Sequence, residues 1–140
     1  MKLILVPEML RNPVGNPPFS LGMVHPGGGQ WLNLSGVSCP AAYPSIGEEV
    51  ITVMEEVFER VIKGGFTPED IFHVRLMIVG KSSAALVQEI NGAYRRAFSQ
   101  VGVAATKGSV LPGRETFFVY DLIGGAMVEA TVKAWSSGDD

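Results

Sequence analysis

Cysteine, histidine and charged residues are all scarce in this 140-residue chain, and each scarcity argues against a class of function. Cys39 is the single cysteine, so an intrachain disulfide and a cysteine-based metal cluster are both impossible. A lone cysteine of this kind is more often a small apolar filler than a nucleophile. His25 and His73 lie far apart in the sequence and lack the spacing of metal ligands. We therefore expect no metal site.

The chain also lacks a basic patch and a long apolar run. Its net charge is −3, whereas nucleic-acid-binding proteins carry clustered positive charge. No apolar stretch approaches the ~18 residues of a membrane helix. The apolar stretch from Leu3 to Pro7 is too short for the core of a signal peptide. We expect a soluble, cytoplasmic protein that binds neither nucleic acid nor a membrane.

Apolar residues, in contrast, are abundant. They make up 46% of the chain, and charged residues only 18%. The length fits one domain spanning residues 1–140. Two interpretations of the apolar content remain open. Apolar surface could be buried between subunits, which the composition favours, or the core could be rich in valine, alanine and glycine.

The pattern of apolar residues predicts two helices among six strands. Ser45 begins a capping-box sequence, and Gly64-Gly65 ends the helix that follows. The predicted strands are 2–6, 20–25, 31–37, 71–79, 115–122 and 126–135, and the predicted helices are 46–63 and 84–101. Gly124-Gly125 is typical of a two-residue hairpin turn between the last two strands. The simplest packing is α+β, with both helices on one face of a mixed or antiparallel sheet, whose other face then needs a partner.

Two further details of this pattern matter for the site. In the strand 71–79, alternation puts Phe72 on the same face as Val74, Leu76 and Ile78. Residues 102–113 form a long predicted loop, and loops of that length in small domains are often functional.

Arg114 and Glu129 are the candidate functional residues. An arginine at the start of an apolar strand suits bidentate binding of a carboxylate. A glutamate within an apolar strand is costly unless it is paired or functional. Alternation places Arg114 on one face with Thr116. The residues alone leave two other interpretations open, an arginine facing solvent and a glutamate paired with Lys133.

Short motifs along the chain resemble those of one protein family. In chain order they are Pro18-Phe19-Ser20, Leu34-Ser35-Gly36, the stretch from Gly65 to Val74, Asn91 with Tyr94 and Phe98, Pro112-Gly113-Arg114-Glu115-Thr116, and Gly125-Ala126-Met127-Val128-Glu129. They are similar to the P-Y-S, V-S-G, G-x-x-x-x-D-V-x-K-V, N-x-x-Y-x-x-F, P-x-R-x-T and G-A-x-V-E motifs of the Rid/YjgF family. Each motif alone is weak, but their order and spacing cover nearly the whole chain.

The resemblance implies a homotrimer of chorismate-mutase-like subunits, with a ligand cleft at each subunit interface. It also implies hydrolysis of enamine or imine products of amino-acid metabolism to ketoacids and ammonia, without a cofactor. Arg114 would hold the substrate carboxylate, and Glu129 would orient the attacking water. The resemblance implies a pocket lined by Phe19, Ser35, Gly36, Asn91 and Thr116.

Several positions depart from the family pattern. Phe19 replaces a common tyrosine, Val37 a common glutamine, and Thr116 a frequent cysteine. The substrate therefore stays open. So do two alternatives to deamination, which are ligand binding without turnover and other hydrolytic or biosynthetic chemistry on a larger substrate.

The predicted hairpin has a geometric consequence. If Gly124-Gly125 closes it regularly, Tyr120 faces Glu129, and Arg114 lies six residues away along the strand. At ~3.3 Å per residue, Arg114 and Glu129 are then about 20 Å apart in one chain. Both could line one cleft only if they came from different subunits.

Overall fold

The computed structural model describes residues 22–26, 28–103 and 111–137. The predicted strand 2–6, Phe19 and most of the predicted loop 102–113 lie outside the described residues. The strands are β1 (Gly22–Pro26), β2 (Gln30–Val37), β3 (Ile71–Val79), β4 (Gly113–Val119) and β5 (Val128–Ser136), and the helices are α1 (Ile46–Lys63) and α2 (Ala84–Gln100). Short 3-10 turns cover Pro68–Asp70 and Ile123–Gly125.

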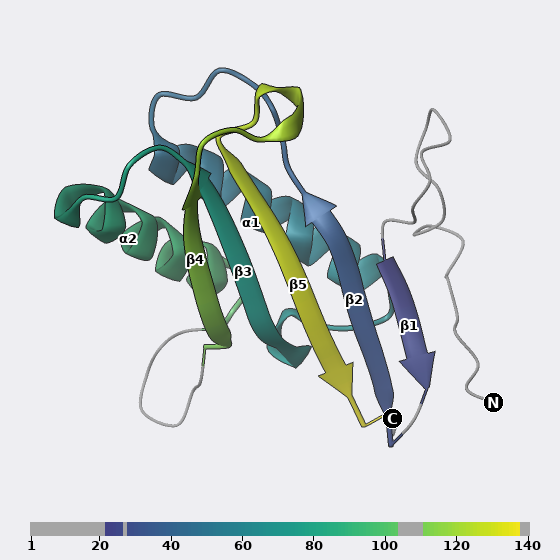
Figure 1. Cartoon of the computed structure of the whole chain (residues 1–140). Coiled ribbons are helices and arrows are strands. Elements are labelled where there is room, and N and C mark those ends of the chain that lie inside the picture. Colours follow the sequence, from purple (N-terminus) through teal and green to yellow (C-terminus); the bar gives the residue numbers. More distant parts are fainter. Residues whose placement is uncertain (1–21, 27, 104–110, 138–140) are drawn as a thin grey trace.

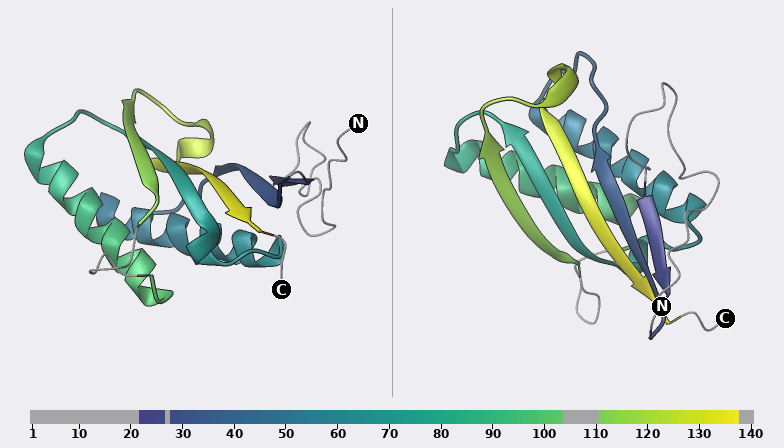
Figure 2. Two further views of the ribbon diagram at one scale, coloured as in Figure 1. Left: turned by 90° about the horizontal axis from the view of Figure 1, so that it is seen from below. Right: turned by 45° about the vertical axis from the view of Figure 1, so that its right-hand side comes forward.

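The five strands form one mixed sheet in the order β1-β2-β5-β3-β4. β3 and β4 run parallel, and the other neighbouring pairs are antiparallel. Figures 1 and 2 show both helices on the same side of this sheet, which leaves its other face uncovered by helix. The predicted α+β class with two helices on one face is therefore confirmed.

The helices begin and end where their capping residues predict. The Ser45 side chain accepts a hydrogen bond from the Glu48 amide at 3.2 Å, and Gly64 follows the last residue of α1. The apolar stripe of α1 is buried against the sheet and α2, including Val50, Val53, Met54, Val57 and Val61. Burying each such side chain stabilises the fold by roughly 1.5–3 kcal/mol. Phe58 and Phe98 join the two helices, with ring centroids 5.0 Å apart.

The predicted hairpin between the last two strands is wrong. β4 pairs with β3, and β5 lies between β2 and β3, so the connection 120–127 passes over the end of β3 (Figure 1). Gly124 and Gly125 do adopt positive φ, at 77° and 76°. They bend the chain locally, but a glycine pair does not determine which strand the next segment pairs with. The buried face of β5 is made of valines and alanines that are at most 1% exposed, and this suits a central strand covered by helices.

A buried carboxylate holds the beginning of β5. Glu49 on α1 is 3% exposed, and its Oε2 accepts hydrogen bonds from the amides of Met127 at 2.9 Å and Val128 at 2.8 Å. The Met127 carbonyl in turn accepts from the Val79 amide at 2.9 Å. These hydrogen bonds connect α1, β3 and the segment that leads into β5, immediately before Glu129.

Two β-bulges change which side chains reach the open face. In β2, Leu34 pairs with Val132 and Val37 pairs with Ala130, so Ser35 and Gly36 together oppose Thr131. In β3, the register shifts between Ile71 and His73. Bulges re-aim side chains locally and are frequent beside functional sites.

Candidate functional site

Arg114 lies on the edge strand β4 and points to the helix side of the sheet. Its neighbour across the strands is Val74, a fully buried core residue, and paired residues share a face. Arg114 Nη2 donates a hydrogen bond to Asn91 Oδ1 at 2.6 Å, and the guanidinium carbon lies 4.8 Å from the centroid of the Tyr94 ring. Asn91 and Tyr94 are one helical turn apart on α2, which presents both to β4.

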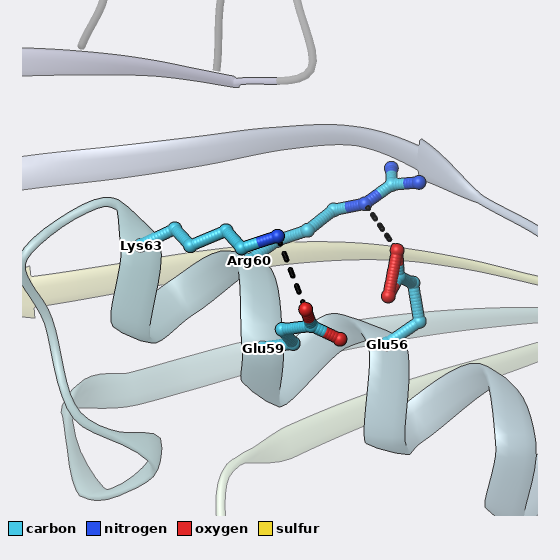
Figure 3. A network of polar contacts seen from close by, with 4 residues as sticks. All are labelled: Glu56, Glu59, Arg60 and Lys63. Atoms are coloured by element: carbon cyan, nitrogen blue, oxygen red, sulfur yellow. Dashed lines mark hydrogen bonds and ion pairs between the residues drawn. The ribbon is translucent and has the colours of Figure 1, made fainter. Parts of the chain in front are cut away.

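The partners of Arg114 are neutral, which distinguishes it from Arg60, Lys63 and Arg75. Figure 3 shows Arg60 and Lys63 on α1 paired with glutamates at 3.4 and 3.0 Å. Arg75 is also paired with a glutamate at 3.4 Å. No carboxylate of the described residues forms an ion pair with Arg114. Burial lowers the pKa of the Arg114 guanidinium, but an arginine stays charged at neutral pH. Its positive charge is therefore available to an anion.

Two buried hydroxyls on the same side have no hydrogen-bond partner among the described residues. They are the hydroxyls of Tyr94 and Thr116. Thr116 pairs with Leu76, so it lies on the same face as Arg114, two residues further along β4. Burial raises the pKa of Tyr94, and the charge of Arg114 opposes the rise. An unpartnered buried hydroxyl costs about 1–3 kcal/mol. A polar ligand or water beside Arg114 would remove part of that cost.

Glu129 belongs to a second group, on the open face of the sheet. It pairs with Met77, which alternates with the buried residues Leu76 and Ile78. The Glu129 carboxylate lies over Gly36, where an added Cβ would come within 2.8 Å of Oε2. The missing side chain of Gly36 leaves room for the carboxylate. Ser35 shares the open face with Gly36, because both lie in the bulge between the buried residues Leu34 and Val37.

Arg114 and Glu129 consequently lie on opposite faces of the sheet in one chain. β3 separates their strands, and their partners on β3, Val74 and Met77, are three residues apart. Two strand spacings across and three residues along put the two backbones roughly 14 Å apart. The predicted 20 Å rested on the wrong hairpin. The sequence-based expectation that one subunit does not bring the two residues into one pocket agrees with this geometry.

The structure thus divides the predicted site residues into two groups. Asn91 and Thr116 accompany Arg114, while Ser35 and Gly36 accompany Glu129, and Phe19 lies outside the described residues.

One residue with a direct contact to Arg114 was not predicted as part of the site. Tyr94 entered the sequence analysis only as part of the N-x-x-Y-x-x-F motif. Its i, i+3 spacing from Asn91 nevertheless places both residues on one helix face. Val37, where the family commonly has glutamine, is fully buried on the helix side of the sheet. It therefore faces away from Glu129, and β5 and β3 separate its strand from that of Arg114.

Comparisons with known proteins identify the fold. Three similar solved structures are YyfA of the Rid family from Yersinia pestis, TdcF from E. coli with bound serine, and yeast Mmf1. Their TM-scores are 0.71, 0.71 and 0.69, at 22%, 20% and 17% sequence identity. The alignments cover 96%, 94% and 96% of this chain and 100%, 98% and 99% of the other. The resemblance to the Rid/YjgF family is confirmed at the level of the fold.

Comparison by sequence adds no relative. No family model matches the chain, and no curated protein matches it.

Within residues 22–26, 28–103 and 111–137, no group of three or more histidine, cysteine, aspartate or glutamate side chains is arranged to hold a metal ion. Neither helix described has the length and apolarity that a membrane span requires.

Proposed function

We propose that this chain is a divergent member of the Rid/YjgF family that hydrolyses enamine or imine intermediates to a ketoacid and ammonia. One observation carries the proposal. The half-buried Arg114 is held by Asn91 and Tyr94, neither of which neutralises its charge. Such an arginine is prepared for a carboxylate, and the substrates of this reaction class carry one.

The chemistry needs little beyond positioning. An enamine first takes a proton on carbon to become an imine, which is already electrophilic. Water adds to the imine carbon while a proton goes to the nitrogen, and the resulting carbinolamine breaks its C–N bond to give the ketone and ammonia. Arg114 anchors the carboxylate, and Glu129 orients the water and accepts its proton.

The two groups of site residues are brought together between subunits of a homotrimer. Arg114, Asn91 and Thr116 come from one subunit, and Glu129, Ser35 and Gly36 from its neighbour. Their positions on opposite sheet faces support this arrangement, because each group is internally complete and neither can reach the other in one chain. The serine bound to TdcF, a relative by fold, is a small molecule with a carboxylate.

The first experiment measures ketoacid and ammonia release from 2-aminoacrylate generated in situ. We expect the protein to accelerate hydrolysis, and Arg114→Ala to lower kcat/KM by about 10- to 150-fold, the equivalent of one charge-assisted hydrogen-bond pair. Arg75→Ala is the matched control, because Arg75 lies on the open face and is already paired with Glu115. Equal losses in both variants, or no acceleration by the parent protein, would refute the proposal.

A second experiment tests the shared site by subunit mixing. Arg114→Ala and Glu129→Gln should each be strongly impaired alone. When the two variants are unfolded and refolded together in equal amounts, about a quarter of the interfaces in a random trimer should combine an intact Arg114 with an intact Glu129. Turnover by the parent protein without any recovery in the mixture would show that the site is not divided in this way.

A ligand-binding protein without turnover is the second candidate. The observation in its favour is that the Arg114 group is complete within one subunit, whereas Glu129 lies on the other face. Such a protein would bind a small carboxylate, would lose this binding in Arg114→Ala, and would bind equally well in Glu129→Gln. Calorimetric titration with serine, combined with the turnover assay, separates the two functions.

A further inference from the structure

A hollow of about 700 Å³ lies at the end of the open sheet face, where β2 begins, β5 ends and β3 begins (Figure 1). Three of its lining residues are aromatic, Trp31, Phe72 and Trp135, and two are acidic, Glu69 and Asp70. Trp135 is six residues from Glu129 on β5, so the hollow lies about 20 Å from that carboxylate. The proposed deaminase chemistry uses none of these residues.

The aromatic side chains form walls with different orientations. Trp31 and Phe72 have ring centroids 5.7 Å apart and planes at 88°, and Trp31 and Trp135 lie 6.3 Å apart at 61°. Rings at these angles cannot stack flat and hide one another. Trp31 and Phe72 are each 41% exposed and Trp135 is 39% exposed, so ring surface remains available to a ligand. Phe72 joins the group because the bulge at the start of β3 turns it away from the core.

The backbone at Gly29 packs closely against the Trp135 ring. Gly29 has a φ of 116°, and a Cβ added there would lie 2.8 Å from Trp135 Nε1 and against the Ser136 carbonyl oxygen. Only a residue without a side chain allows the turn before β2 to pack this closely on the indole. The turn before β2 therefore packs directly against the Trp135 indole at one side of the hollow.

The two charged side chains that line the hollow are both acidic. Glu69 is exposed, and the Asp70 carboxylate is held at the rim by the Thr67 amide, which donates to Oδ2 at 2.9 Å. None of the described residues that line the hollow is a lysine, an arginine or a histidine. The negative faces of aromatic rings attract cations, and carboxylates add to that attraction. We propose that this hollow is a binding site for an organic ammonium ion.

The chain contains two tryptophans, and both line the hollow, so selectively excited tryptophan fluorescence reports on this site. The probe is choline, titrated at constant chloride concentration against sodium chloride. Its neutral counterpart is 3,3-dimethyl-1-butanol, which has the same shape with a carbon in place of the charged nitrogen. We expect a saturable fluorescence change with choline, and binding of the neutral alcohol at least about tenfold weaker. Equal responses to both compounds, or no saturable response to choline, would overturn the proposal.

Paired variants test the residues of the site. Phe72→Ala removes one wall and should weaken choline binding about fivefold or more, by the typical size of one cation–π contact. Phe117→Ala is the matched control, because Phe117 is 45% exposed on the same sheet face but does not line the hollow. Glu69→Gln, at an exposed position, should weaken choline while leaving the neutral alcohol unchanged.

Both phenylalanine variants keep the two tryptophans, and thermal unfolding checks that each variant is folded. If Phe72→Ala binds choline as well as Phe117→Ala does, the aromatic wall is not part of a site. If tryptophan emission instead changes on dilution and choline has no effect, a second copy of the chain fills the hollow, and the proposal is wrong.

Discussion

Replacing Glu49 with alanine should destabilise the fold more than any single surface change. Glu49 is a carboxylate on α1 that is 3% exposed and accepts hydrogen bonds from two amides at the start of β5. Alanine leaves both amides without their acceptor. The substitution therefore tests whether this carboxylate holds the segment that leads into Glu129.

The size of the effect follows from the two orphaned amides. Each buried donor left unpaired costs about 1–3 kcal/mol, so two cost about 2–5 kcal/mol after partial hydration. A domain of this size loses roughly 3–4 °C in Tm per kcal/mol, which gives a fall of about 6–20 °C. Glu49→Gln is the matched variant, because its amide oxygen can still accept both bonds. We expect it to lose about 1–2 kcal/mol, the charge-assisted part of the interaction.

Urea unfolding followed by circular dichroism measures the change in the free energy of unfolding, provided that the slope m is the same in all three proteins. The deaminase assay adds a second measurement. Displacement of residues 127–129 should lower kcat of Glu49→Ala in the folded fraction, while affinity for a carboxylate ligand at Arg114 stays unchanged. A loss below about 0.5 kcal/mol in Glu49→Ala, or equal losses in both variants, would refute the reasoning, because the two amides would then not depend on this acceptor.

Three further predictions concern single side chains. Gly36→Ala puts a methyl group 2.8 Å from Glu129 Oε2 and should lower turnover by displacing the carboxylate, with little change in Tm; unchanged kinetics would contradict this. Tyr94→Phe removes a group whose pKa is raised by burial, so the parent protein should lose more stability than the variant as the pH rises above the usual tyrosine value near 10. Urea midpoints at pH 8 and pH 11 measure this, and parallel losses would show that Tyr94 is not responsible. Gly29→Ala requires an L-residue at a φ of 116° against the Ser136 carbonyl, so it should lower Tm and shift tryptophan emission; an unchanged emission spectrum would contradict the close packing.

The helices and β3 could be predicted from the sequence because their signals are local. Ser45 and Gly64 mark the two ends of α1 through backbone groups within a few residues. β3 has the predicted bounds, Ile71–Val79. Its first residues do not follow strict alternation, however, because a bulge places Phe72 outside the core. A bulge depends on the partner strand, which the pattern of one strand does not reveal.

The position of β5 could not be predicted for the same reason. Gly124-Gly125 predicts a turn, and a turn is present, but the pairing of β4 with β3 depends on contacts between segments far apart in the chain. Insertion of β5 beside β3 is favoured by small buried side chains such as Ala130 and Ala134, and the sequence shows these without showing what covers them.

The sequence indicated one contact of the candidate site, but it did not indicate that the candidate residues lie on two faces of the sheet. The motif containing Asn91 and the strand start at Arg114 predicted two residues that are hydrogen-bonded in the structure. That Arg114 and Glu129 face opposite sides of the sheet depends on β3 lying between their strands. The sequence does not give the strand order. For the same reason it does not reveal the contact between Gly36 and Glu129.

The central place of β5 has a consequence for synthesis on the ribosome. β5 is the last of the described elements to be translated, yet it joins β2 to β3 and supplies the amides that Glu49 binds. Until it emerges, β1 and β2 can pair only with each other and β3 only with β4, so β2 and β3 each lack a neighbour at the edge that β5 fills. Such edges pair readily with other chains. Residues 128–136 therefore convert two aggregation-prone halves into one sheet in a single late step, and a ribosome that stalls before them leaves both halves exposed to chaperones.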